Sequence, residues 1–248
     1  AFVVAVARER PDAVLVGGDT ATAETVALFL VRLEKDLGVP LFFVLGNHDF
    51  YGGRIAEVRE AVRARSERSP WLRWLPAAGV VPLTDTTALV GHDGWGDGRL
   101  GSGVRSGLVL NDHLLIEDFA EMVGGRRRRR DLTSDRFLEA FWGARHLRFV
   151  RLQALGDEAA AHVRATLPAA LERFPRVLFL THAPPFREAC FHGAGLSDDD
   201  GLPHFTCHAV GEALEPGEDA ASVLLGVGRD GELEPGRVDR PALHDPHR

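Results

Sequence analysis

The stretch LFFVLGNHD, residues 41–49, joins an apolar run to a turn that is rich in polar side chains. The run Leu41 to Leu45 shows no alternation of apolar and polar residues, which predicts a strand buried on both faces. Gly46 allows a tight turn after this strand. Asn47, His48 and Asp49 then stand at its carboxyl end, which is where open α/β sheets bind their ligands.

Three other short apolar runs end in the same way. Residues 13–16 lead through two glycines to Asp19, residues 88–90 lead through Gly91 to His92 and Asp93, and residues 177–180 lead through Thr181 to His182. Asp and Asn oxygens combined with imidazole nitrogens suit Mn, Fe or Zn. We therefore expect a metal site where these strand ends meet.

Helical patterns lie between the predicted strands. Residues 20–37, 54–65 and 147–174 have the spacing of amphipathic or Ala/Leu/Arg-rich helices, and residues 1–10 resemble the second half of a helix. Strands that alternate with helices predict an α/β fold with a parallel or mixed sheet.

The composition is that of an ordinary globular protein. The chain has 248 residues, 45% hydrophobic and 26% charged, so it forms one large domain or two small ones and is neither disordered nor a disulfide scaffold. A net charge of −7 argues against a nucleic-acid partner, and no apolar run is long enough to span a membrane. Two cysteines without a visible secretory signal predict reduced thiols and a cytoplasmic location. The oligomeric state is not determined by these features.

Each candidate residue also has a structural interpretation. Asp19 can cap a helix that begins near residue 20, Asn47 and Asp49 suit a turn, and His182 can be a hydrogen-bonded core histidine. Gly91-His92-Asp93-Gly94 is also a good turn sequence. Each structural interpretation is reasonable by itself, but together they are less convincing. Turn formation alone does not require the same kinds of metal-binding side chain at several strand ends.

Three further segments are given structural interpretations. The five arginines 126–130 fit a solvated loop or helix start better than a phosphate-binding patch. Residues 197–201, Ser-Asp-Asp-Asp-Gly, lack the spacing of a calcium loop and predict a turn. A zinc site made from the cysteines and nearby histidines fits no strong spacing template, so we expect buried thiols and surface histidines; these residues are Cys190, His192, His204, Cys207 and His208.

The motifs together resemble those of the calcineurin-like metallophosphoesterases. The resemblance rests on Gly18-Asp19, on Gly46-Asn47-His48-Asp49 twenty-eight positions later, and on Thr181-His182-Ala183-Pro184-Pro185. It covers about residues 12–214. Residues 91–97 and 203–208 resemble a bacterial, poorly characterised branch of that family.

The resemblance implies an αββα sandwich that hydrolyses a phosphate mono- or diester, on a small or a large molecule, with a hydroxide that bridges two divalent ions (Mn, Fe or Zn). Asp19 would bridge both ions, and Asn47 and His182 would bind the second. His48 would protonate the leaving oxygen, and Asp49 would orient His48. His92 and Asp93 are expected on the substrate side.

The sequence departs from the family pattern at both ends. No Asp-x-His motif precedes Gly18-Asp19, and Gly226-Val227-Gly228-Arg229 stands where the family has Gly-His-x-His. We therefore expect an incomplete sandwich that lacks its first strand and has doubtful C-terminal strands, with one domain over residues 1–221 and a divergent, disordered tail over 222–248. This segment alone is expected to hold one ion or none and to be nearly inactive.

Two alternatives to the phosphoesterase remain. The first is a catalytically incompetent fragment or remnant of the same fold. The second is an α/β nucleotide-binding module, which is the weaker alternative because no Gly-rich phosphate loop follows the first predicted strand.

Overall fold

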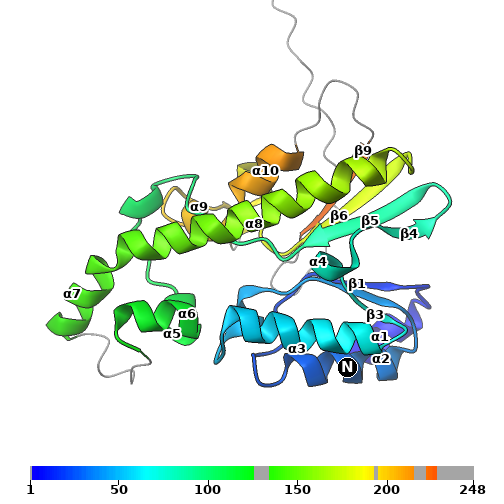
Figure 1. Ribbon diagram of the computed structural model, residues 1–248, viewed down its shortest axis with the longest axis horizontal. Helices are drawn as coiled ribbons and strands as arrows, with labels where there is room; N and C mark the ends of the chain where they lie inside the picture. The colour runs from blue at the N-terminus through cyan, green and yellow to red at the C-terminus, as the bar shows by residue number, and fades with distance from the viewer. Residues whose placement is uncertain (1, 126–133, 193–194, 215–221, 228–248) are drawn as a thin grey trace, which may run out of the picture.

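A computed structural model describes residues 2–125, 134–192, 195–214 and 222–227, and it contains two facing sheets (Figure 1). The first sheet is parallel and has the order β1 (Val14–Val16), β2 (Leu41–Phe43) and β3 (Leu72–Trp74). The second has the order β4 (Val81–Thr84), β5 (Thr87–His92), β6 (Arg176–Thr181) and β9 (Ser222–Val227), with only β4 antiparallel to its neighbour. A small hairpin consists of β7 (Phe191–His192) and β8 (Gly195–Leu196).

The alternation of side chains along β2 explains why the sheets stack. Leu41 and Phe43 face the helices α2 (Val26–Leu37) and α3 (Ile55–Arg68), where they belong to one apolar cluster with Leu30 and Val62. Phe42 belongs instead to the cluster between the sheets, together with Val44, Leu75, Leu89 and Leu180. Each face of this strand is therefore covered, as its uninterrupted apolar sequence predicts.

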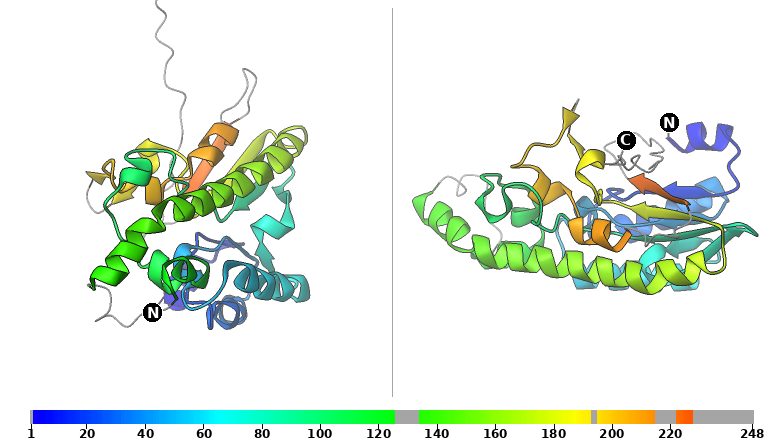
Figure 2. Two further views of the ribbon diagram at one scale, coloured as in Figure 1. Left: turned by 60° about the vertical axis from the view of Figure 1, so that its left-hand side comes forward. Right: turned by 90° about the horizontal axis from the view of Figure 1, so that it is seen from above.

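The second sheet is covered on its outer face by α8 (Arg145–Leu171) and α10 (His208–Leu214). Ala159, Val163 and Leu167 of α8 pack there against Val90 and Phe179. Seen from above, α8 runs along one whole side of the molecule (Figure 2). Helices on the outer faces of two stacked sheets give the order αββα, so the predicted fold class is confirmed.

The remaining helical segments are short. They are α1 (Phe2–Arg8), α4 (Leu75–Ala78), α5 (Asp112–Leu115), α6 (Glu117–Ala120), α7 (Asp135–Gly143) and α9 (Leu202–Phe205). Single turns of 3-10 helix occur at residues 47–50, 103–105, 121–123 and 187–189. The segments α5, α6 and α7 extend beyond one end of the sheets (Figure 1).

Most predicted elements are present, with shifted ends. The helix expected over residues 20–37 begins only at Val26. The chain before it runs through bends and turns, in which the Thr20 and Ala21 amides donate to the Asp49 carboxylate. Residues 198–201 form the expected turn, in which Asp198 Oδ1 accepts a 2.8 Å hydrogen bond from the Gly201 amide.

The expected tail and the arginine run fall partly or wholly outside the described residues. Ser222–Val227 pairs in parallel with β6, so the second sheet continues past residue 221. Residues 228–248 and the arginines 126–130 lie outside the part of the chain that is described.

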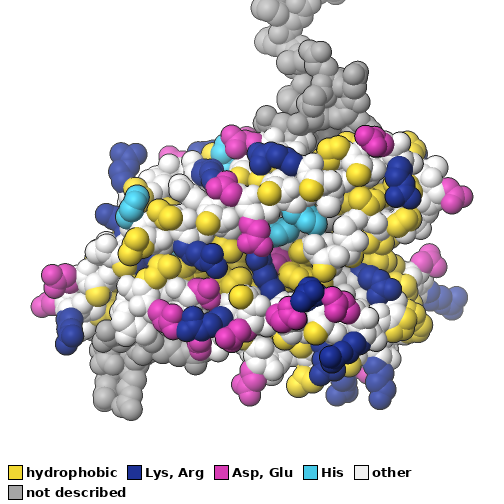
Figure 3. Space-filling view, in the orientation of Figure 1, with side chains coloured by type: hydrophobic (Ala, Val, Ile, Leu, Met, Phe, Trp, Pro, Cys, Tyr) yellow, Lys and Arg dark blue, Asp and Glu magenta, His cyan; other side chains and the backbone are white. Residues whose placement is uncertain are grey.

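No described helix combines the length and the apolar character that crossing a membrane requires. Acidic and basic side chains are interspersed over the face shown in Figure 3.

Candidate metal centre

Three loops converge at the carboxyl ends of β1, β2 and β6. They carry Asp19, Asn47 and His182 respectively. His182 Nε2 lies 3.0 Å from Asn47 Oδ1 and 3.6 Å from Asp19 Oδ1. The structure thus brings the three predicted ligands together across both sheets, although Asp19 and His182 are separated by more than 160 positions in the sequence.

Two glycines allow this close approach. A Cβ atom at Gly18, whose φ is +96°, would lie 2.5 Å from the Gly46 amide nitrogen and 2.8 Å from His182 Nδ1. A Cβ atom at Gly46 would collide with the Asp19 carboxylate. Asp19 itself has a φ of +54°, an unfavourable backbone conformation for a residue with a side chain. Such strain is typical of functional sites.

The hydrogen bonds around His182 fix the direction of its lone pair. Nδ1 lies 2.8 Å from the Gly17 carbonyl oxygen, which only accepts, so Nδ1 carries the proton. In the neutral ring, Nε2 then presents a lone pair to Asn47 Oδ1. The Asn47 amide cannot turn its NH₂ group to Nε2, because Nδ2 donates a 2.8 Å hydrogen bond to Asp112 Oδ1.

Three electron-pair donors therefore face one another: Asp19 Oδ1, Asn47 Oδ1 and His182 Nε2. A divalent cation between them would relieve this repulsion, and the N/O donor set suits Mn, Fe or Zn. The bond from Nδ1 to a backbone carbonyl is the usual support of a metal-binding histidine. The residues present therefore fit one ion.

His48 lies beside this group. Its backbone amide donates to Asp19 Oδ1 at 3.0 Å, and its Nδ1 is 3.7 Å from Asp19 Oδ2. The side chain is 51% exposed and packs on the Tyr51 ring, with centroids 4.6 Å apart. An exposed imidazole at the edge of the site, held on one side by a carboxylate, can exchange protons with a bound molecule.

Asp49 does not make the contact with His48 that the resemblance implies. Its carboxylate is fully buried and accepts from the Thr20 amide and hydroxyl, from the Ala21 amide and, at 2.9 Å, from the Gly46 amide. Burial raises the pKa of Asp49, and these hydrogen bonds oppose the rise. Asp49 therefore ties the loop after β1 to the turn after β2.

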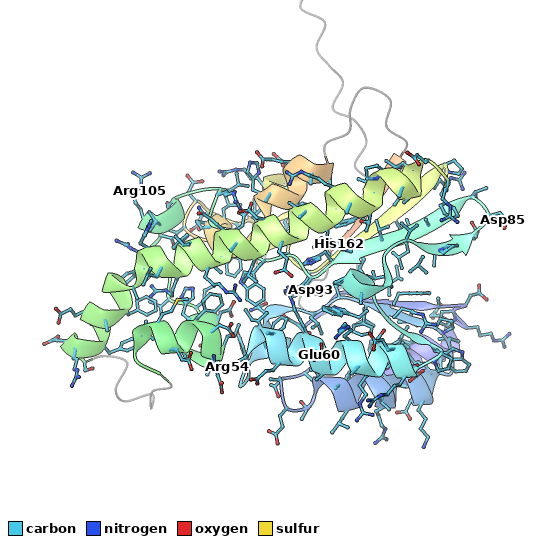
Figure 4. The ribbon with its side chains drawn as sticks, in the orientation of Figure 1. Arg54, Glu60, Asp85, Asp93, Arg105 and His162 are labelled. Atoms are coloured by element: carbon cyan, nitrogen blue, oxygen red, sulfur yellow. The ribbon has the colours of Figure 1, made fainter. Side chains whose placement is uncertain are left out.

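His92 and Asp93, expected on the substrate side, are buried and are not among the described residues that line the cavity over the candidate ligands. Asp93 is fully buried: its Oδ1 accepts from the Leu45 amide at 2.8 Å and from Trp74 Nε1 at 3.0 Å, and its Oδ2 faces Arg59 at 3.4 Å. The labelled Asp93 and His162 lie between α8 and α3 in Figure 4.

His92 is buried against His162, and this burial lowers the pKa of His92 to about 3. Because β5 ends inside the core, its Gly-His-Asp sequence supports the site from behind. The Asp93 carbonyl oxygen accepts the His182 amide at 3.1 Å and so helps to place the loop that carries His182.

Sequence reasoning missed Asp112 and Tyr51. Asp112, at the start of α5, is buried and accepts from both Asn47 Nδ2 and the Tyr51 hydroxyl, the latter at 2.7 Å. Burial raises the pKa of Asp112, while these two donors lower it. Nothing in the local sequence around residue 112 marks a site, because the contact joins segments 65 positions apart.

A cavity of about 1040 Å³ opens over the candidate ligands. Polar lining residues include Asp19, His48 and Asp112, and the aromatic side chains of Trp95 and Phe205 contribute to its wall. Among its described lining residues there is no Arg or Lys.

Both cysteines are buried, as expected, whereas His204 does not lie at the surface as expected. Cys190 and Cys207 are free and buried, and burial raises the pKa of Cys207 to about 12. His204 is buried instead of lying at the surface, and its Nε2 is 3.1 Å from Ser106 Oγ. Within the described residues, no three His, Cys, Asp or Glu side chains are arranged to hold one metal ion. The candidate site has two such groups and the Asn47 amide.

Comparison with known proteins identifies the family. The calcineurin-like phosphoesterase model matches residues 2–204, so the chain belongs to this family. Among solved structures, the chain is similar to a dimetal phosphatase from Danio rerio, with 16% sequence identity and a TM-score of 0.40. The match covers 86% of this chain and 65% of that one, so the chain spans less than two thirds of the length of that structure. No curated protein matches the sequence.

Proposed function

We propose that this protein hydrolyses a phosphate ester with the help of divalent transition-metal ions, Mn, Fe or Zn. Asp19, Asn47 and His182 would hold the ion for which the described residues provide ligands. The observation that carries the proposal is the 3.0 Å approach of His182 Nε2 to Asn47 Oδ1, two atoms that both present lone pairs when the imidazole is neutral and Nδ1 donates to Gly17. Membership of the calcineurin-like phosphoesterase family supports it.

The residues divide the chemistry between them. A bound ion would polarise a phosphoryl oxygen and increase the acidity of water. His48 would give a proton to the leaving oxygen; with Nδ1 beside Asp19, its Nε2 is the nitrogen free to do so. Asp49 would act indirectly, since its four hydrogen bonds hold the turn from which Asn47 and His48 project.

The cavity supports a phosphate mono- or diester of modest negative charge as substrate. A polyanionic ligand such as a nucleic acid would gain little from walls whose described residues include Asp19 and Asp112 but no Arg or Lys. The aromatic wall would suit an uncharged organic group.

A second candidate is a protein of this fold that binds one ion without turnover. It is favoured by the donor set itself, because the described residues supply ligands for one ion and no second group of ligands. Paired ions are the usual device for displacement at phosphorus. The two candidates differ in the number of ions bound and in the rate of hydrolysis.

Manganese titration by calorimetry, with nitrophenyl phosphate and bis-nitrophenyl phosphate hydrolysis on the same samples, tests both. We expect His182→Ala to weaken Mn²⁺ binding by about 100-fold or more, because loss of indirect partners already costs about 10–100-fold. The matched control His92→Asn should bind like the wild type. A wild type that binds no Mn²⁺, Fe²⁺ or Zn²⁺ contradicts the proposal. One bound ion with background hydrolysis favours the second candidate.

A further inference from the structure

Asp112 joins the candidate metal centre to the helices that extend beyond the sheets. It stands at the first position of α5 and is 7% exposed. Its Oδ1 accepts from Asn47 Nδ2 at 2.8 Å and from the Tyr51 hydroxyl at 2.7 Å. Neither the family motifs nor the local sequence assigns a role to this carboxylate.

We propose that Asp112 is a positioning residue that fixes the Asn47 amide with its oxygen toward the metal ion, an inference that rests on the proposed function. An amide presents an acceptor on one side and a donor on the other, and only the oxygen can bind a cation. A carboxylate accepts hydrogen bonds, so Asp112 selects the NH₂ group and turns the oxygen toward His182. Without it, either orientation of the amide is available.

The same carboxylate fixes Tyr51. The hydroxyl of Tyr51 donates to Asp112, while the ring packs against His48 at a centroid distance of 4.6 Å and an interplanar angle of 36°. Asp112 is thus linked by one oxygen atom to a candidate metal ligand and, through Tyr51, to the candidate proton donor. Both links come from the turn of residues 47–51.

The backbone holds Asp112 in place independently of these bonds. The Gly52 amide donates to the Leu115 carbonyl oxygen at 2.9 Å, and the Glu117 amide donates to the Gly53 carbonyl oxygen at 3.0 Å. The next residue, His113, is buried against Phe119 and Phe141 and anchors α5 in the core. The fold of α5 therefore does not depend on the Asp112 carboxylate, which supports testing it by an isosteric change.

The test is a set of Mn²⁺ affinities measured by calorimetry on the whole chain. Asp112→Asn should weaken binding by about 10–100-fold, because an amide at 112 can also donate to Asn47 Oδ1 and turn that oxygen away. Tyr51→Phe, which keeps the bond between Asn47 and Asp112, should change the affinity by less than about 3-fold. Melting temperatures measured on apo samples control for folding.

A double exchange supplies the rescue. Asn47→Asp combined with Asp112→Asn restores an NH₂ group that donates to a carboxylate, and both oxygens of Asp at 47 can bind the ion. In the Asn47→Asp background, Asp112→Asn should therefore change the Mn²⁺ affinity by less than about 5-fold, whereas a purely structural or directly ligating Asp112 predicts the same loss of about 10–100-fold in that background.

The outcomes separate the two proposals. A wild type without Mn²⁺ binding overturns the proposed function and this inference with it. Wild-type binding that Asp112→Asn leaves unchanged overturns the inference alone. If Asp112→Asn does not fold, the double exchange decides: an affinity equal to that of Asn47→Asp supports the positioning role, and a weaker affinity than that of Asn47→Asp in a folded protein overturns it.

Discussion

His48 and His92 occupy similar local sequences, since each stands at the end of an apolar run, shortly after a glycine and directly before an aspartate. The structure gives them opposite surroundings. His48 is half exposed at the rim of the cavity, with Asp19 on one side. His92 is 4% exposed and packs on His162, where burial lowers its pKa to about 3.

The aspartate that follows each histidine uses its carboxylate to bind other residues, and not to orient the histidine. Asp49 binds the loop after β1, and Asp93 binds the Leu45 amide, Trp74 and Arg59. Both are buried carboxylates that hold backbone segments together at the site. How deeply the motif is buried decides whether its side chains line the cavity or lie in the core behind it. The local sequence does not determine this burial.

The largest expected effect comes from comparing His48→Asn with His92→Asn on two phosphate esters, in a version of the protein to which segments carrying the family's Asp-x-His and Gly-His-x-His motifs have been added. His48→Asn should slow hydrolysis of an alkyl ester by about 10²–10⁴-fold, because an alkoxide needs a proton in order to leave. A nitrophenyl ester should be slowed far less, and Mn²⁺ affinity should stay unchanged. His92→Asn should leave the ratio of the two rates as in the wild type. If His48→Asn lowers the rates of hydrolysis of both esters equally, His48 is not the proton donor.

Urea unfolding compares the fully buried Asp93 with the partly buried Asp19. Asp93→Ala leaves the Arg59 guanidinium opposite an apolar side chain and removes the acceptor of Leu45 and Trp74, so the free energy of unfolding should fall by about 3–5 kcal/mol. Asp19→Gly loses one hydrogen bond but relieves a φ of +54°, so we expect a change of less than about 1 kcal/mol. Similar losses for both variants would contradict this difference.

The smallest effect is a change in the pH dependence of stability. His92 has a folded pKa of about 3 and an unfolded pKa near 6.5, so between these values only the unfolded state binds the proton. Stability should therefore fall by about 1.4 kcal/mol per pH unit for this group as the pH drops from 6.5.

Replacing His92 should flatten that slope by the same amount. Urea midpoints between pH 6.5 and 4.5 should decline less steeply in His92→Asn than in the wild type. Asp93, whose pKa is raised by burial, contributes with the opposite sign in both proteins, and Arg59, His162 and Glu158 are retained in both. Identical slopes would show that His92 is protonated in the folded state.

Much of the fold could be predicted from the sequence, because it depends on local patterns. The uninterrupted apolar run at residues 41–45 predicts the two-sided burial of β2, and the long Ala/Leu pattern predicts α8. The conformation of residues 20–21 could not be predicted, since the Thr20 and Ala21 amides donate to Asp49, far along the chain.

The candidate site divides in the same way. Asp19, Asn47, His48 and His182 stand directly after strands, so their position at the sheet ends follows from sequence. Asp112 and Tyr51 gave no such signal. Asp112 enters the site because backbone hydrogen bonds such as that between Gly52 and Leu115 dock α5 on the turn after β2.

The sequence by itself determined which chemical groups stand at the ends of which strands, because strand formation and tight glycine turns depend on neighbouring residues. Only the tertiary structure decided how each group is used. Solvent exposure and hydrogen-bond partners come from segments distant in the chain, and they place the lone pair of His182 beside Asn47 and Asp19 while enclosing His92 and Asp93 in the core.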